Sequence, residues 1–201
     1  TRRSSDLVCQ GAGTLALWGC KGPERPPKTE FVLFDLSAST ATPEVRARYL
    51  EDFEKLLANL YEGDILVVDR ITSNPLAEST FPVNEIFKRM NPWSENLLKW
   101  RRESKGQRER IARTVKKMVT DPQQRSSKTS IVDALHLAQR VFATYPNERQ
   151  VLVLFSDMVE ESPYYDFRKE NLTASRIQEI LEVEKAENRL PRLDGAHVYV
   201  I

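Results

Sequence analysis

The stretch F-V-L-F-D-L-S-A-S-T, residues 31–40, decides the fold that we expect for this chain. Four apolar residues run directly into Asp35, and hydroxyl side chains follow at Ser37 and Ser39. A short apolar run that stops at a polar cluster is typical of a buried strand in a parallel sheet, whose carboxyl end opens into a loop. We therefore expect a strand that ends near Asp35.

The polar residues after this strand suit a hard divalent cation. Asp35, Ser37 and Ser39 are oxygen donors, which Mg²⁺ or Mn²⁺ prefers, whereas zinc would favour His or Cys. The same residues also suit the start of a helix, because Asp, Ser and Thr are good N-caps and Pro43 follows them. On these residues alone, a metal-binding loop and a helix cap both stay open.

Two later stretches extend the pattern. The run V-L-V-L-F-S-D, residues 151–157, delivers Ser156 and Asp157 at the end of another apolar strand. Ahead of it, K-T-S-I-V-D-A-L, residues 128–135, places Thr129 just before a helix with an apolar face. In this order the three motifs resemble the von Willebrand factor A domain and its metal-ion-dependent adhesion site. The resemblance runs from about residue 28 to residue 201, although Ser-Ser-Lys precedes Thr129 where many members of the family have glycines.

The resemblance implies a site for Mg²⁺ or Mn²⁺ made by five residues. By the family's geometry, the hydroxyls of Ser37, Ser39 and Thr129 would contact the metal, and Asp35 and Asp157 would act mainly through water. Three hydroxyls leave at least one octahedral position open, which a carboxylate of a partner protein would fill. The resemblance thus implies a protein interaction module of bacterial type, with an unknown acidic partner and no small-molecule substrate.

The rest of the chain alternates between helix and strand patterns. The apolar spacing predicts helices over residues 43–61, 93–120, 130–145 and 174–183, and strands over residues 64–71, 80–83, 151–155 and 196–201. Such alternation predicts an α/β fold with a doubly wound, mostly parallel sheet flanked by helices. Loops at the carboxyl edge of such a sheet bind ligands, so Asp35, Thr129 and Asp157 are expected to meet there. The family would add a further helix after the last strand, so either the natural protein continues beyond residue 201 or the last strand is a bare end.

Residues 1–27 match no element of this domain, which we place at residues 28–201. A basic start and an apolar middle lead to L-W-G-C, residues 17–20, which resembles a bacterial lipoprotein signal with lipid on Cys20. The Pro-rich residues that follow would then act as a tether. This interpretation predicts a membrane-anchored protein facing the periplasm or exterior, and the alternative, a disordered leader, predicts a cytoplasmic one. Both cysteines, Cys9 and Cys20, lie in this leader.

The charges of the chain nearly cancel. Lys and Arg number 30 against 29 Asp and Glu, a formal charge of +1, so bulk charge favours neither nucleic acid nor membrane as a partner. A charged helical insertion is expected at about residues 93–120, with its basic side chains concentrated at residues 99–117. Flanked by Trp93 and Trp100, this stripe suits either phosphate groups or a solvated helix face, and we favour the solvated face.

An enzyme is the competing class of function. An Asp at the end of a first strand is similar to the nucleophile of phosphohydrolases of the haloacid dehalogenase type, which would be Asp35 here. Those enzymes favour a second Asp where this chain has Ser37, and Lys128 is the one loose candidate for their lysine. His136 and His197 are expected to be structural, and Asp69 is either an acidic neighbour of the site or the partner of an arginine. A third alternative is a scaffold with a vestigial metal site.

Overall fold

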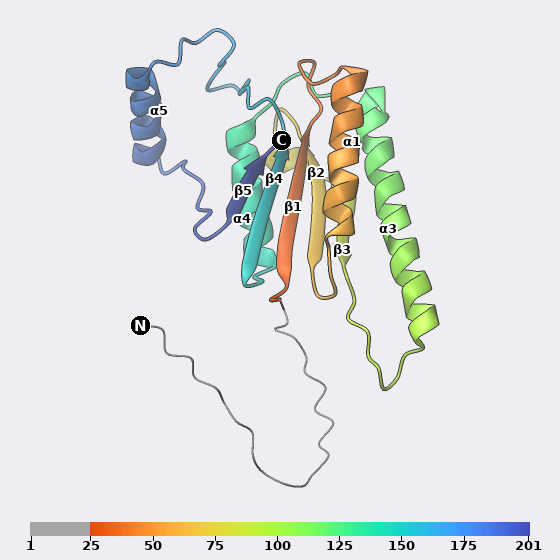
Figure 1. Ribbon diagram of the computed structural model, residues 1–201. Coiled ribbons are helices and arrows are strands. Elements are labelled where there is room, and N and C mark those ends of the chain that lie inside the picture. Colours follow the sequence, from red (N-terminus) through yellow and green to blue (C-terminus); the bar gives the residue numbers. More distant parts are fainter. Residues whose placement is uncertain (1–24) are drawn as a thin grey trace, which may run out of the picture.

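The computed structural model describes residues 25–201, and a five-stranded sheet forms its centre (Figure 1). The strands lie in the order β3-β2-β1-β4-β5, with β1 central. Four of them are parallel and β3, an edge strand, runs antiparallel to β2. Their bounds are β1 (Lys28–Asp35), β2 (Ile65–Ile71), β3 (Val83–Ile86), β4 (Arg149–Phe155) and β5 (His197–Val200). The expectation of an α/β fold with a mostly parallel sheet is confirmed. The lipoprotein prediction for Cys20 falls outside the described residues.

Helices cover both faces of the sheet centre. One face carries α1 (Pro43–Ala58) and α3 (Leu97–Thr120), and the other carries α2 (Pro75–Glu78) and α4 (Ile131–Thr144) (Figure 1). In β1, Val32 and Phe34 face α1 and α3, while Phe31 and Leu33 face α4. Since both faces are covered, the strand reads as a continuous apolar run. A short 3-10 helix, η1 (Pro122–Gln124), links α3 to the loop before α4.

The first helix follows directly from its sequence. Thr42 caps it by accepting the N–H of Val45 at 3.3 Å, and Pro43 supplies its first residue. Tyr49, Phe53 and Leu57, spaced four apart, form its buried stripe. Each such side chain stabilises the fold by about 1.5–3 kcal/mol through burial. The helix ends at Ala58, three residues earlier than the pattern predicts.

The expected start of the long charged helix is corrected. The helix begins at Leu97 and not at residue 93, because the side-chain oxygen of Asn96 caps it by accepting the N–H groups of Leu98 at 2.9 Å and Lys99 at 3.2 Å. The helix α3 then continues through Gly106 without interruption to Thr120. Its carboxyl half is buried on the sheet through Ile111, Val115, Met118 and Val119. Its amino half projects past the amino ends of the strands (Figure 1).

The expected edge strand at residues 80–83 is also corrected, and Asp69 is the reason. The N–H groups of Thr80 and Phe81 donate to Asp69 Oδ2, both at 2.9 Å, so they are not available to a strand ladder. Phe81 takes a left-handed φ of 45°, and β3 starts only at Val83. Asp69 is buried, its pKa is raised mainly by burial, and its other oxygen accepts the N–H of Arg70. It therefore anchors a loop through backbone groups, instead of pairing with an arginine side chain as expected.

The carboxyl-terminal region departs furthest from the expectation. The strand β5 forms within the predicted residues 196–201, but all four of its residues are exposed, although its apolar sequence is typical of a buried strand. The helix α5 (Ala174–Ala186) stands apart from the sheet, as Figure 1 shows. Apolar side chains on it, such as Ile177 and Leu181, are exposed as well. An apolar pattern predicts a buried face, but it does not specify which element covers that face.

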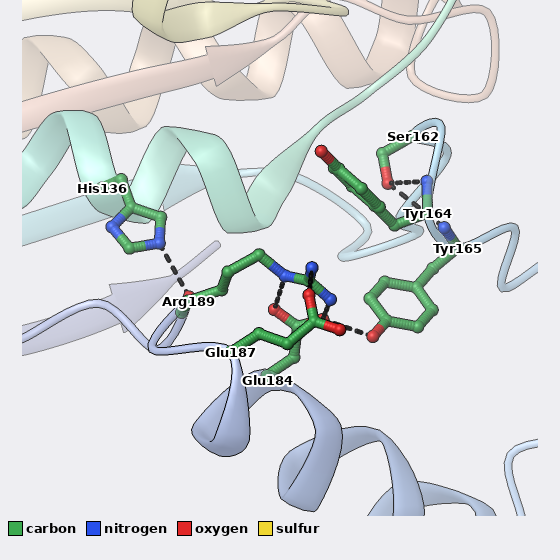
Figure 2. Close-up of polar contacts among 7 residues, drawn as sticks. All are labelled: His136, Ser162, Tyr164, Tyr165, Glu184, Glu187 and Arg189. Atoms are coloured by element: carbon green, nitrogen blue, oxygen red, sulfur yellow. Dashed lines mark hydrogen bonds and ion pairs between the residues drawn. The ribbon is translucent and has the colours of Figure 1, made fainter.

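A polar cluster ties the end of α5 to the rest of the domain (Figure 2). The buried Glu184 carboxylate receives two hydrogen bonds from Arg189, at 2.8 and 3.0 Å, and a third from the hydroxyl of Tyr165. Arg189 also stacks on Tyr164, and its carbonyl bonds the ring of His136 at 2.7 Å. The hydrogen bonds from Arg189 lower the pKa of Glu184. His136 is thus half-buried and structural in this cluster, whereas His197 is exposed.

Candidate metal centre

The strand order of the sheet reverses between β1 and β4. From β1 the chain passes through α1 to β2 on one side, while β4 lies on the other side of β1. The loops that leave β1 and β4 therefore diverge, and crevices of this kind bind ligands in open α/β sheets. Asp35 ends β1, and Ser156 and Asp157 follow β4. The candidate site is at this edge.

The Asp35 carboxylate is the fixed centre of the site. It is fully buried, and each of its oxygens accepts one hydrogen bond. The backbone N–H of Ser37 donates to Oδ1 at 2.9 Å, and the hydroxyl of Ser156 donates to Oδ2 at 2.9 Å. Because Ser156 belongs to the loop after β4, this second bond joins the two loops of the crevice. Asp35 is oriented by these donors and does not rotate freely.

The hydroxyls of Ser37 and Ser39 lie together beside Asp35. Their oxygens are 3.0 Å apart. Two neighbouring ligands of an octahedral Mg²⁺, each at about 2.1 Å from the ion, are separated by roughly 3.0 Å. The observed spacing is compatible with two ligands of one cation, and it is also the spacing of a hydrogen bond between the two hydroxyls. Ser37 is buried and Ser39 is exposed, so the pair spans the boundary between protein and solvent.

Thr129 lies in the loop that leads into α4. Its side chain is buried, and its backbone N–H and C=O pair with Glu161 at 3.2 and 2.8 Å. Three residues before Thr129, the N–H of Ser126 donates to the carbonyl of Leu36 at 3.3 Å, which joins this loop to the segment after β1. The residue types before Thr129 differ from the glycines of the family, yet the backbone connection to the first loop is made.

Glu160 is a residue of this region that sequence reasoning missed. Its carboxylate is buried, and Oε2 accepts the N–H groups of Ile131 at 2.6 Å and Val132 at 3.3 Å. It therefore satisfies the first turn of α4, where Ser130 provides no side-chain cap. Burial raises the pKa of Glu160. Since it lies far from α4 in the sequence, no local pattern indicates this role.

Asp157, like Ser39, is exposed to solvent. Its carboxylate accepts the N–H of Val159 at 3.2 Å, and the next residue, Met158, has a φ of 60°, in the strained left-handed region. Burial raises the pKa of Tyr49 to about 12, and the charges of Asp35 and Asp157 add to the effect. Both carboxylates therefore lie close enough to Tyr49 to raise its pKa. The ring of Tyr49 contacts Phe34 and Phe155, whose own rings stack with their centroids 4.6 Å apart.

A buried cation, Arg46, also belongs to the site. Its guanidinium donates to the carbonyls of Asp35 at 3.3 Å and Ser37 at 3.4 Å. Burial lowers the pKa of Arg46, and the Asp35 charge opposes that effect. The sequence does hold a signal for it, because Arg46 precedes Tyr49 by three positions and so falls on the buried stripe of α1. Its charge offsets part of the negative charge of Asp35.

The structure brings some of the expected site residues into contact and leaves the others in neighbouring loops. Asp35, Ser37, Ser39 and Ser156 form one hydrogen-bonded group, whereas Thr129 and Asp157 lie in the adjoining loops. Within residues 25–201, no hydrogen bond joins the side chain of Thr129 or Asp157 to this group. The described part of the chain also has no cluster of three or more His, Cys, Asp or Glu placed to hold a metal. A cation at this edge would depend on hydroxyl oxygens.

Comparisons with known proteins give likenesses in structure alone. No family model and no curated protein matches the sequence. A von Willebrand factor type A protein from Catenulispora acidiphila is 14% identical, with 87% of this chain and 33% of that chain covered and a TM-score of 0.49. Proximal thread matrix protein 1 from the mussel byssus is 16% identical, with 87% and 37% covered and a TM-score of 0.47. The N-terminal domains of the type V pili tip protein from Porphyromonas gingivalis are 11% identical, with 75% and 22% covered and a TM-score of 0.48. The chain thus spans between 22% and 37% of the length of these structures.

Proposed function

We propose that this chain is a protein interaction module that holds Mg²⁺ or Mn²⁺ beside Asp35 and uses it to bind a carboxylate of a partner protein. One observation carries the proposal. The hydroxyls of Ser37 and Ser39 lie 3.0 Å apart, beside a buried carboxylate that Ser156 orients. Hydroxyl and carboxylate oxygens are the donors that these hard cations prefer.

The residues of the site would have different roles. Ser37, Ser39 and Thr129 would supply hydroxyl ligands, and Asp35 and Asp157 would hold the metal's water ligands and balance its charge. A bound cation supplies a Lewis-acidic position that an acidic side chain of the partner can fill. Because few charged groups would contact the metal directly and Arg46 is close by, affinity for the cation alone should be modest and should rise when the partner binds.

The phosphohydrolase alternative is not favoured by the geometry of Asp35. A nucleophilic carboxylate must reach its substrate, but this side chain is fully buried and both of its oxygens accept hydrogen bonds from Ser37 and Ser156. A scaffold with a vestigial site is the remaining alternative, and it predicts no metal dependence.

Retention on an immobilised library of acidic peptides tests the proposal. The full chain should be retained in Mg²⁺ and released by a chelator. Ser39→Ala and Asp157→Ala should weaken retention, since both side chains are exposed and their loss opens no cavity in the core. Ser175→Ala and Asp194→Ala, exposed positions remote from the site in sequence, are matched controls and should behave as the wild type.

Two results would contradict the proposal. Retention that is the same with chelator and with Mg²⁺ would favour the scaffold. Metal-dependent turnover of a generic phosphate ester that Asp35→Asn abolishes would establish the enzyme instead.

A further inference from the structure

The amino-terminal end of α3 exposes large apolar side chains to solvent. Trp93 is 96% exposed, Leu98 70% and Leu97 42%. The amino-terminal end of α3 lies at the end of the molecule where the strands begin, opposite the sheet edge that carries the candidate metal centre (Figure 1). We call residues 88–105 the α3 tip. Trp93 and Leu98 are the two most exposed large apolar side chains of the described residues, and with Leu97 they fall within six consecutive positions, as a group and not as scattered single residues.

The loop that carries Trp93 is held in place by its own contacts. Trp93 N–H donates to the side chain of Asn91 at 3.0 Å, and Asn91 N–H donates to Glu95 at 2.9 Å. The indole of Trp100 bonds the carbonyl of Lys88 at 3.3 Å, which joins the loop to the first turns of α3. The exposed apolar residues are therefore presented by an ordered support and not by a free segment.

Basic residues flank these apolar residues on both sides in the sequence. The α3 tip contains six Lys and Arg against two Glu, a formal charge of +4 in a chain whose total is only +1. Lys88 is paired with Glu95. Within the described residues, no carboxylate lies within ion-pair distance of Arg101 or Arg102, both of which are exposed. The α3 tip thus combines exposed apolar side chains with arginines that make no ion pair within the described residues.

We propose that the α3 tip docks on an anionic membrane surface, with Trp93, Leu97 and Leu98 entering the interface and Arg101 and Arg102 contacting lipid phosphates. An exposed Trp with neighbouring leucines and a basic rim is the pattern of interfacial membrane binding. Nucleic acid is less suited, because it offers bases for aromatic stacking but no apolar layer for two leucines. No helix in the described part of the chain is both long and apolar enough to cross a membrane, and docking of this kind needs none.

The docking surface sets the orientation of the candidate metal centre. The helix α3 has 24 residues, a length of about 36 Å, and it runs from the tip to the carboxyl edge of the sheet. A chain docked by the tip would therefore present the Asp35 edge away from the membrane. This inference does not depend on the metal, and it adds a contact separate from the lipid predicted on Cys20.

Vesicle binding tests the proposal with a Cys20→Ser chain, which excludes any contribution of lipid on that cysteine. The chain should float with vesicles of phosphatidylcholine and phosphatidylglycerol, but not with phosphatidylcholine alone. Raising salt from about 0.1 M to about 1 M should release it, because the Debye length falls from about 10 Å to about 3 Å. With Trp18 replaced by Phe, the emission of the two remaining tryptophans, Trp93 and Trp100, should shift to the blue on the anionic vesicles.

Paired variants locate the contact. Trp93→Ala with Leu98→Ala, and Arg101→Glu with Arg102→Glu, should each weaken vesicle binding about tenfold or more. Lys116→Glu with Lys117→Glu makes the same charge change about 22 Å away on the same helix and should leave binding nearly unchanged. The proposal is overturned if anionic vesicles are not bound, or if the Lys116 and Lys117 control loses binding equally. Binding of homopolymeric RNA without vesicle binding, or a dimer that Trp93→Ala dissociates, would overturn it in favour of another partner.

Discussion

Replacing Ser156 with Ala tests how the candidate metal centre is built. The hydroxyl of Ser156 donates to Asp35 Oδ2 at 2.9 Å and accepts the N–H of Met158 at 3.0 Å. Without it, a fully buried carboxylate oxygen loses its donor from the β4 loop. A hydrogen bond to a charged group contributes about 1.5–3 kcal/mol, so the free energy of unfolding should fall by about that amount.

Thermal and urea unfolding in chelator measure this loss. For the 177 described residues, 25–201, each kcal/mol lowers the melting temperature by roughly 2–4 °C, so the midpoint should fall by roughly 3–12 °C. Ser127→Ala, an exposed serine in the neighbouring loop, is the control and should change the free energy by less than about 0.5 kcal/mol. If Ser156→Ala is as stable as this control, the bond does not hold Asp35 and the account of the site is wrong.

Three further predictions follow from particular residues. Burial raises the pKa of Glu30 above its ordinary 4.5, so its contribution to stability is complete below pH 4.5 and is lost as pH rises through the raised value. Between pH 4.5 and that raised pKa, the free energy of unfolding of the wild type should therefore decline relative to that of Glu30→Gln, by at most about 1.4 kcal/mol per pH unit. Urea midpoints of the two proteins that run parallel as a function of pH would contradict this. Arg46→Met removes a buried positive charge beside Asp35 and should strengthen Mn²⁺ binding several-fold by calorimetry, and weaker binding in a folded variant would contradict that role. When bacterial fractions are prepared at high salt, which screens docking of the α3 tip, Cys20→Ser should move the chain from the membrane fraction to the soluble fraction. A wild-type chain that is already in the soluble fraction would contradict the lipoprotein prediction.

The sheet centre was predictable because its residues carry the information locally. Residues 31–35 and 151–157 each combine an apolar run with a polar end, and such runs occur when both faces of a parallel strand are covered. The buried stripe of α1 was likewise visible in its spacing. The juxtaposition of Asp35 with the loop after β4 follows from the parallel topology alone.

Other features depend on contacts between distant residues. No local sequence pattern near Thr80 or Phe81 predicts that their N–H groups donate to Asp69, so that β3 starts only at Val83. Glu160 caps α4 from 29 residues away, and no helix-capping rule reaches that far. The exposure of β5 could not be predicted, because the apolar run at residues 198–201 has the same sequence pattern whether or not another element covers it.

Mn²⁺ binding to the purified chain, followed by electron paramagnetic resonance, tests the central claim most directly. The account predicts one chelator-sensitive Mn²⁺ per chain, competed by Mg²⁺, with Ser39→Ala and Asp157→Ala each weakening binding about tenfold or more while Asp194→Ala has no effect. The absence of bound Mn²⁺, or equal binding by all of these variants, would contradict a metal site at Asp35, Ser37 and Ser39.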